Sequence, residues 1–170
     1  MILELVPPGS DILRTKTERF DFTNSPTNPV ELYQNLANTM LEKDGVGLAA
    51  VQCGLPYRVF VVHSDPVMGF FNPEIVDTSE ETVELEEGCL TYPGLFLKVR
   101  RPRKIRIRFA DALGEIVSKP FDSLTSRIIQ HEMDHLDGIL FGETVSRLQL
   151  EMAIKKTKKT GYTYSIGDFL

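Results

Sequence analysis

The sequence contains few cysteines, no long apolar run and no targeting segment. Only Cys53 and Cys89 are present, so a disulfide framework cannot hold the fold together. No apolar run approaches the roughly 18 residues that span a bilayer. Residues 1–20 lack the apolar core and the small-residue cleavage site of a secretory signal. These absences favour a cytosolic protein with reduced thiols and no membrane partner.

Basic residues are fewer than acidic residues. The chain has 19 lysines and arginines and 24 acidic residues, which gives a formal net charge of −5. This balance argues against a nucleic-acid footprint over the whole protein, so we expect no DNA partner. The chain of 170 residues has no repeat and no linker long enough to divide it. Residues 1–170 are therefore expected to form a single domain with one core.

Cap and stop residues delimit the first long helix. Asn28 can cap it, Pro29 fits its first turn and Gly45 supplies a stop. Upstream, Ile2–Val6 looks like a short strand, and a helical turn is expected near Asp11–Arg14. Runs of β-branched and aromatic residues predict six further strands, at Tyr57–Val62, Phe70–Val76, Thr82–Leu85, Phe96–Val99, Lys104–Phe109 and Glu115–Ser118.

A second helix is predicted from Asp122 or Ser123 to Gly138, and a third from Ser146 to about Lys158. Residues 161–170 have the composition of an irregular segment. Helices at both ends of a largely antiparallel β region indicate an α+β fold.

Residues 131–135 read His-Glu-Met-Asp-His, the most informative stretch of the chain. On a helix, positions four apart share one face, so His131 and His135 can offer two imidazoles to one metal ion. Glu132 can reach a water on that metal as general base. The pattern predicts a metal-dependent hydrolase. The expected fold is therefore mainly antiparallel β-sheets packed around a central metal-binding helix, with an N-terminal helix and a C-terminal helix.

A catalytic metal site of this kind usually has a third protein ligand. Metzincins supply a downstream histidine, but Phe141 stands at that position. Thermolysin-like enzymes supply a downstream glutamate, for which Glu143 and Glu151 are available, although Glu151 lies in a basic segment typical of a surface.

Upstream, His63, Cys53 and Cys89 are further candidates. A histidine at the end of a strand is more often a turn residue, and free cysteines are commonly buried without a special role. Cys89 follows a glycine that permits unusual backbone geometry, so its thiolate could face the helix. Chemistry places Cys89 first without deciding the matter.

Three segments resemble, in order and spacing, the signature motifs of the peptide deformylases. They are Gly45–Gln52 (Gly-Val-Gly-Leu-Ala-Ala-Val-Gln), Glu87–Leu90 (Glu-Gly-Cys-Leu) and Gln130–Leu136 (Gln-His-Glu-Met-Asp-His-Leu). The resemblance implies one catalytic domain that removes the formyl group from the N-terminal formylmethionine of new polypeptides. One departure is Thr91, where the family usually has serine. The stretch Tyr92–Phe96 also lacks the charged residues of some deformylases.

The same resemblance implies that Cys89, His131 and His135 bind one divalent metal ion, usually Fe²⁺. A Cys-His-His set alone would suggest Zn²⁺, and Ni²⁺ or Co²⁺ can occupy such sites in preparations. Glu132 would act as the base. The Gln52 amide and the Leu90 backbone N–H would stabilise the charge that develops on the formyl oxygen.

Substrate is expected to bind along glycine-rich backbone. The resemblance implies β-like hydrogen bonds from the loop that contains Val46 and from around Gly88, because glycines allow close approach. An apolar pocket should take the methionine side chain. The expected substrate-binding residues are Gly45, Val46, Gly47, Leu85, Gly88, Leu124 and Ile128, of which Leu85, Leu124 and Ile128 could equally be ordinary core. Asp134 and Arg101 could orient the ligands, or form a surface ion pair.

The lysines at 155, 156, 158 and 159 place positive charge on an acidic protein. A solvated helix face is one interpretation, and contact with ribosomal RNA is the other, since the implied substrate is a nascent chain. A zinc metallopeptidase that cleaves internal bonds and a silent binding module remain as alternative functions. The sequence is compatible with a bacterial, an organellar or a viral source. A viral protein would act in the cytosol of its host.

Overall fold

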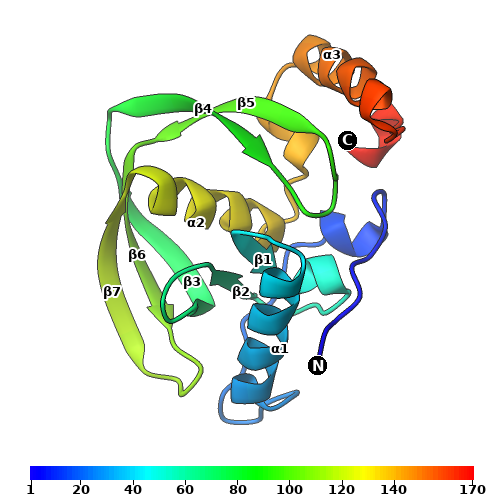
Figure 1. Ribbon diagram of the computed structural model, residues 1–170. Helices are drawn as coiled ribbons and strands as arrows, with labels where there is room; N and C mark the ends of the chain where they lie inside the picture. Colours follow the sequence, from blue (N-terminus) through cyan, green and yellow to red (C-terminus); the bar gives the residue numbers. More distant parts are fainter.

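The computed structural model describes residues 1–170 and has a helix between two antiparallel sheets. The larger sheet has the order β1-β2-β3-β6-β7 and the smaller pairs β4 with β5. The strands are β1 (Gly47–Ala49), β2 (Val59–Val62), β3 (Met68–Thr78), β4 (Thr82–Gly88), β5 (Phe96–Pro102), β6 (Lys104–Ala110) and β7 (Ile116–Asp122). The helices are α1 (Pro29–Glu42), α2 (Ser123–Leu136) and α3 (Arg147–Thr157). Figure 1 shows α2 between the β4–β5 hairpin and the larger sheet. The expected α+β fold is confirmed.

The first helix begins where its cap predicts but ends earlier than expected. The Asn28 side chain accepts a hydrogen bond from the Glu31 backbone N–H (3.0 Å), which satisfies a free donor of the first turn. The helix stops at Glu42, and Asp44, rather than Gly45, takes the left-handed conformation with φ 53°. The Gly45 stop was therefore wrong. Asp is one of the few residues other than glycine that enter this region at a modest cost.

The predicted strand at Ile2–Val6 was also wrong, because this segment joins neither sheet. Its backbone attaches elsewhere, since the Val6 N–H donates to the Gln52 carbonyl (2.9 Å). Conversely, the short strand β1 pairs with β2 although its sequence did not predict it. The other predicted strands exist with shifted ends, and β4, β5 and β7 each run about three or four residues further than expected.

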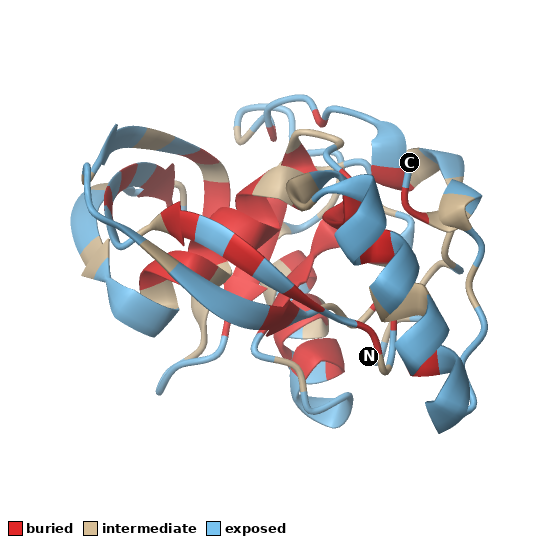
Figure 2. Ribbon diagram, turned by 90° about the horizontal axis from the view of Figure 1, so that it is seen from above, coloured by how far each residue is buried: buried red, intermediate tan, exposed pale blue.

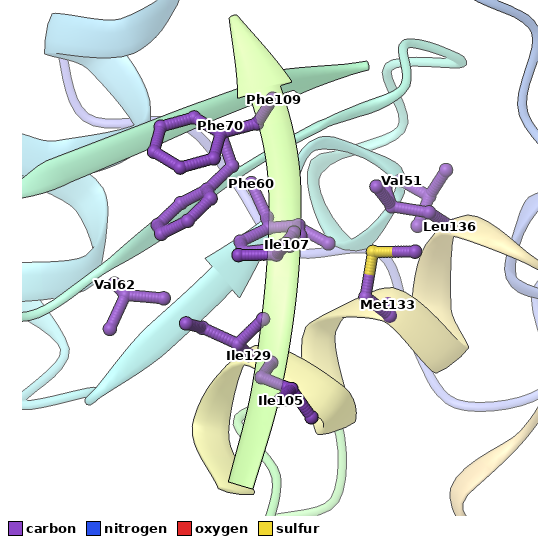
Figure 3. Close-up of a cluster of buried hydrophobic side chains, with 11 residues drawn as sticks. Val51, Phe60, Val62, Phe70, Ile105, Ile107, Phe109, Ile129, Met133 and Leu136 are labelled. Carbon is purple, nitrogen blue, oxygen red and sulfur yellow. The ribbon is translucent and has the colours of Figure 1, made fainter. Parts of the chain in front are cut away.

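Helix α2 separates the core from the candidate site. On one side, Ile129, Met133 and Leu136 pack against Ile105 and Ile107 of β6, as Figure 3 shows. Burial of this stripe fixes the rotation of the helix. The opposite side faces the β4–β5 hairpin, and Figure 2 shows that buried residues gather in the middle of the molecule. No helix has the length and apolar content needed to cross a membrane.

Candidate metal centre

Helix α2 brings three polar side chains into the interior. His131, Glu132 and His135 are 9%, 3% and 4% exposed, respectively. The two imidazole rings lie one turn apart with centroids 5.0 Å from each other. Burial of three such groups is costly unless each has a partner or a ligand, so their placement indicates a functional site.

Cys89 completes this group from the loop that follows β4. Its Sγ lies 3.4 Å from His135 Nε2, and ligand atoms of Cys89, His131 and His135 all lie within 4.8 Å of one another. One thiolate and two imidazoles are a donor set that suits a tetrahedral divalent ion with one open position. The residues therefore fit a metal ion.

The electrostatics favour the form of Cys89 that binds metal. Burial alone would raise the pKa of the thiol, but the nearby positive charge of His135 and a hydrogen bond with His131 outweigh it. The net result is a Cys89 pKa well below its ordinary value. The thiolate is the ligand form of cysteine.

The other ligand candidates from the sequence lie outside the cluster. Glu143 accepts a hydrogen bond from the Leu140 N–H (2.8 Å), and Glu151 pairs with Arg147 on the exposed face of α3 (3.1 Å). His63 is exposed. Burial raises the pKa of Cys53 to about 12, which leaves that thiol protonated at neutral pH.

A buried carboxylate on β4 fixes the orientation of His131. Glu87 Oε1 lies 3.0 Å from His131 Nδ1. Arg101 donates to both carboxylate oxygens of Glu87 (2.6 and 2.9 Å), and Arg127 donates a further hydrogen bond to it (2.5 Å). If Nδ1–H donates to Glu87, the Nε2 lone pair of His131 is free for a metal ion.

The two arginines keep Glu87 ionised despite its burial. Burial alone would raise the pKa of Glu87, but hydrogen bonds from Arg101 and His131 and their charges lower it to about 2. Arg101 also pairs with Asp134 of α2 (2.9 Å) and is only 7% exposed. The alternative of a surface ion pair between Arg101 and Asp134 is therefore wrong.

Glu132 is placed as an isolated carboxyl group beside this cluster. Burial raises the pKa of Glu132 to about 7, and the charges of His131 and His135 only partly offset this effect. Its Oε2 atom has no hydrogen-bond partner. A Cβ atom at Gly47 would lie 2.6 Å from Glu132 Oε1, so the backbone of β1 can pass this carboxyl group only with a glycine there.

Gln52 is held in place beside the thiol. Its Oε1 accepts from the Ala49 N–H (2.9 Å), and its Nε2 donates to Thr91 Oγ1 (3.0 Å) while lying 3.6 Å from Cys89 Sγ. Thr91 thus supplies a hydroxyl that orients the Gln52 amide. Threonine shares this hydroxyl with serine.

A cleft of about 360 Å³ opens over these groups. Of the expected substrate-binding residues, it is lined by Gly45, Val46, Gly47, Gly88, Leu124 and Ile128. Leu85 instead lines an adjacent hollow, which shares Leu124 with the cleft. Leu85 and Leu124 are 44% and 63% exposed, so neither is ordinary core.

Two unpaired strand edges flank the cleft. β1 ends the larger sheet and pairs only with β2, whereas β4 pairs only with β5. Residues at both edges line the cleft, Gly47 on β1 and Gly88 on β4. Free N–H and C=O groups on strand edges can accept an extended peptide as an added strand.

Glu87 stood within the second sequence motif without an assigned role, and Arg127 was not predicted as part of the site. Glu87 follows Val83 and Leu85 at alternate positions of β4, and these two side chains line a hollow together with Leu124 and Arg127 of α2. Arg127 precedes His131 by one helical turn. Charged residues in phase with an inward face were the available signal, because such positions bury a charge only when it is paired.

A Cys-His-His cluster with a buried carboxyl group beside it, on this α+β scaffold, defines a metal-dependent hydrolase. The family model described as Polypeptide deformylase matches residues 2–151. A peptide deformylase of Fusobacterium nucleatum is 35% identical, over 92% of this chain and 91% of its own length.

Solved structures agree. A peptide deformylase from Synechococcus elongatus, in complex with actinonin, has a TM-score of 0.88 at 32% identity, over 99% of this chain and 90% of its own. A Met-Ala-Ser-bound peptide deformylase from Acinetobacter baumannii has a TM-score of 0.79 at 33% identity, over 85% and 99%. The chain belongs to the peptide deformylase family. The function of this family is the removal of the formyl group from N-terminal formylmethionine, by metal-dependent hydrolysis.

The Glu87 network generates a stability prediction. Glu87→Gln removes a charge that two buried arginines share, so unfolding of the metal-free protein at neutral pH should require about 3–5 kcal/mol less free energy. The matched control is Glu84→Gln on the same strand, whose pair with Arg100 is exposed and worth about 0–1 kcal/mol. Urea unfolding measures both, and equal effects of the two substitutions would contradict the network.

The pH dependence follows from the same group. Because the folded pKa of Glu87, about 2, lies below its ordinary value of 4.5, its ionisation stabilises the fold above about pH 4.5. This stabilisation, on the order of 3 kcal/mol, is lost as the pH falls toward 2. We expect Glu87→Gln to flatten this part of the stability curve of the metal-free protein.

Proposed function

We propose that Cys89, His131 and His135 hold one divalent metal ion and that the single domain of residues 1–170 deformylates nascent formylmethionyl peptides at this site. The observation that carries the proposal is the approach of the three ligand atoms within 4.8 Å beside the isolated Glu132. We propose Fe²⁺ as the native ion, which is the usual metal implied by the family motifs. The donor set also suits Zn²⁺, with Ni²⁺ or Co²⁺ as substitutes.

Substrate binding would use the two free strand edges. We propose that an extended peptide lies between the Gly45–Gly47 loop and Gly88, and exchanges backbone hydrogen bonds with both. The apolar wall formed by Val46, Leu124 and Ile128 would surround the methionine side chain, whereas Leu85 lies beyond it. The Met-Ala-Ser ligand in the Acinetobacter structure supports a peptide of this kind.

The bound metal would lower the pKa of a water molecule toward neutrality. Glu132 is positioned to take the proton of that water at its carboxylate, and its raised pKa, about 7, suits a base at neutral pH. The oxygen of that water would then form a bond to the formyl carbon. When the bond from this carbon to nitrogen breaks, Glu132 returns the proton to the leaving amine. The oxygen of the water molecule thereby ends in formate, and one of its protons ends on the free N-terminal amine.

Charge on the formyl oxygen requires fixed donors. The Gln52 amide is restrained at both ends by Ala49 and Thr91, so its second N–H can point toward the substrate without reorganisation. We assign the other donor to the Leu90 backbone N–H, which directly follows Cys89. Loss of one such donor typically costs about 10²–10³-fold in rate.

We propose that the protein acts in the cytosol, at the ribosome. Lys155, Lys156, Lys158 and Lys159 are exposed around the end of α3 and the following turn (Lys158–Thr160). A compact cluster of this charge on an acidic protein suits contact with RNA phosphates. Such a contact would place the cleft near emerging N-termini.

The metal assignment predicts different outcomes for the two cysteines. Cys89→Ser should reduce bound metal to a small fraction of one equivalent and abolish formate release from formyl-Met-Ala-Ser, because the thiolate is lost. Cys53→Ser is the matched control, since Cys53 lies outside the cluster. Metal analysis and formate assay on the same anaerobic samples test this prediction. Full metal content in Cys89→Ser would overturn the ligand set.

The role of Glu132 predicts a separation of metal binding from turnover. Glu132→Gln keeps the shape of the side chain but removes the base, so kcat should fall by about 10²–10⁴-fold with one equivalent of metal retained. Glu151→Gln, on the exposed face of α3, is the control. If Glu132→Gln lost the metal as well, Glu132 would be a ligand and not the base.

Ribosome contact predicts salt-sensitive co-sedimentation with ribosomes. Neutralising lysines 155, 156, 158 and 159 with glutamine should abolish it, because phosphate contacts dominate such binding. The control changes lysines 16, 43, 104 and 119 to glutamine, with the same loss of four charges. Equal loss in both variants would show that net charge, rather than this cluster, is responsible.

A further inference from the structure

The C-terminal residues fold back onto the segment that carries Cys89. We propose that residues 162–170 are a clamp that positions Cys89 for metal binding, with Phe169 as its central residue. This inference rests on the proposed ligand role of Cys89. The clamp lies outside the range 2–151 that the family model matches, and the sequence predicted only an irregular segment there. Phe169 is nevertheless completely buried.

The first contact is with the turn that begins at Cys89. The Tyr92 N–H donates to the Cys89 carbonyl (3.0 Å) and closes this turn. The Tyr92 hydroxyl donates to the Asp168 carbonyl (2.8 Å), and the Tyr92 ring stacks on Phe169 with centroids 4.3 Å apart and an interplanar angle of 27°. Stacked aromatic pairs have a restricted geometry, so the position of Phe169 restricts the turn.

A second set of contacts holds the residues after the turn. The Tyr164 hydroxyl donates to the Pro93 carbonyl (2.7 Å). Gly94 has φ +80°, and a Cβ atom there would lie 2.7 Å from the Tyr162 ring. The clamp therefore covers consecutive backbone groups between Cys89 and β5.

The clamp is itself fixed to the body of the protein. Arg14, on the short helical turn η1 (Asp11–Arg14), donates to the carbonyls of Gly167 and Leu170 (2.7 Å each). Figure 1 shows the red end of the chain beside this blue turn. Phe169 also packs against Gly142. A Cβ atom at Gly142 would lie 2.4 Å from the Cβ atom of Phe169. These contacts attach the clamp to the N-terminal turn and to the segment that contains Gly142.

The same aromatic group reaches the helix that carries the histidines. The Phe141 ring is stacked on Tyr92 with centroids 6.3 Å apart, and its edge-on contact with His131 has a centroid distance of 5.2 Å. Aromatic contacts therefore run from Phe169 of the clamp through Tyr92 and Phe141 to His131 on α2. Two ligands lie on a rigid helix, whereas Cys89 lies on a loop, so its position decides how far the site is preorganised.

Metal release tests the clamp. Phe169→Ala should accelerate the release of Zn²⁺ to an excess of chelator by about 10-fold or more, the usual effect of losing support for a metal ligand. The matched control is Phe20→Ala, which removes a buried ring that contacts Phe22, Tyr57 and Phe71 instead. The control should release Zn²⁺ at the wild-type rate. Equal acceleration in both variants would overturn the clamp in favour of a general loss of stability.

A milder variant covers the case in which Phe169→Ala does not fold. Arg14→Gln removes the donors to Gly167 and Leu170 from an exposed position and leaves no cavity. It should also accelerate Zn²⁺ release, and in the Co²⁺-loaded protein it should alter the thiolate-to-cobalt absorption band. Wild-type release and an unchanged band would overturn the clamp.

The Cys89→Ser protein distinguishes a failure of the clamp proposal from a failure of the proposed function. If Cys89→Ser retains Zn²⁺ as wild type does, the ligand assignment fails and the clamp fails with it. If Cys89→Ser loses Zn²⁺ while Phe169→Ala and Arg14→Gln retain it at the wild-type rate, only the clamp fails.

Discussion

The carboxylate of Glu87 is the group on which the rest of the site depends. It lies between the β4–β5 hairpin and α2, receives hydrogen bonds from Arg101 and Arg127, and contacts His131. A buried carboxylate without partners would be strongly destabilising, but two guanidinium groups compensate its charge. The same group therefore joins the smaller sheet to the helix and fixes the ring of a proposed ligand.

This arrangement gives α2 two tasks on two faces. Its apolar stripe, with Ile129 and Met133, packs on the larger sheet, and its polar face presents His131 and His135 toward Cys89. Because β1 and β4 each have an unpaired edge and both contribute residues to the cleft, the cleft over the proposed ligands is bordered by two edges that can bind a peptide. In the proposed function, peptide recognition and hydrolysis therefore use the same junction.

Local patterns predicted the helices and the pentapeptide because those signals lie within a few residues of one another. Asn28 and Ser146 cap their helices through their own side chains, as their residue types predict. The strand β1 was missed because three residues carry too little periodicity, and Ile2–Val6 was mispredicted because no edge strand receives it. The role of Glu87 depends on residues 14 to 44 positions away, so only the tertiary structure reveals it.

The proposed metal site is tested most directly by a crystal structure of the protein loaded with Fe²⁺ or Zn²⁺, with anomalous diffraction measured at the metal edge. We expect one ion, bound to Cys89 Sγ and to an imidazole nitrogen of each of His131 and His135, while Glu87 remains hydrogen-bonded to His131 Nδ1. An ion bound through Glu87, or at a place that excludes Cys89, would contradict this ligand set.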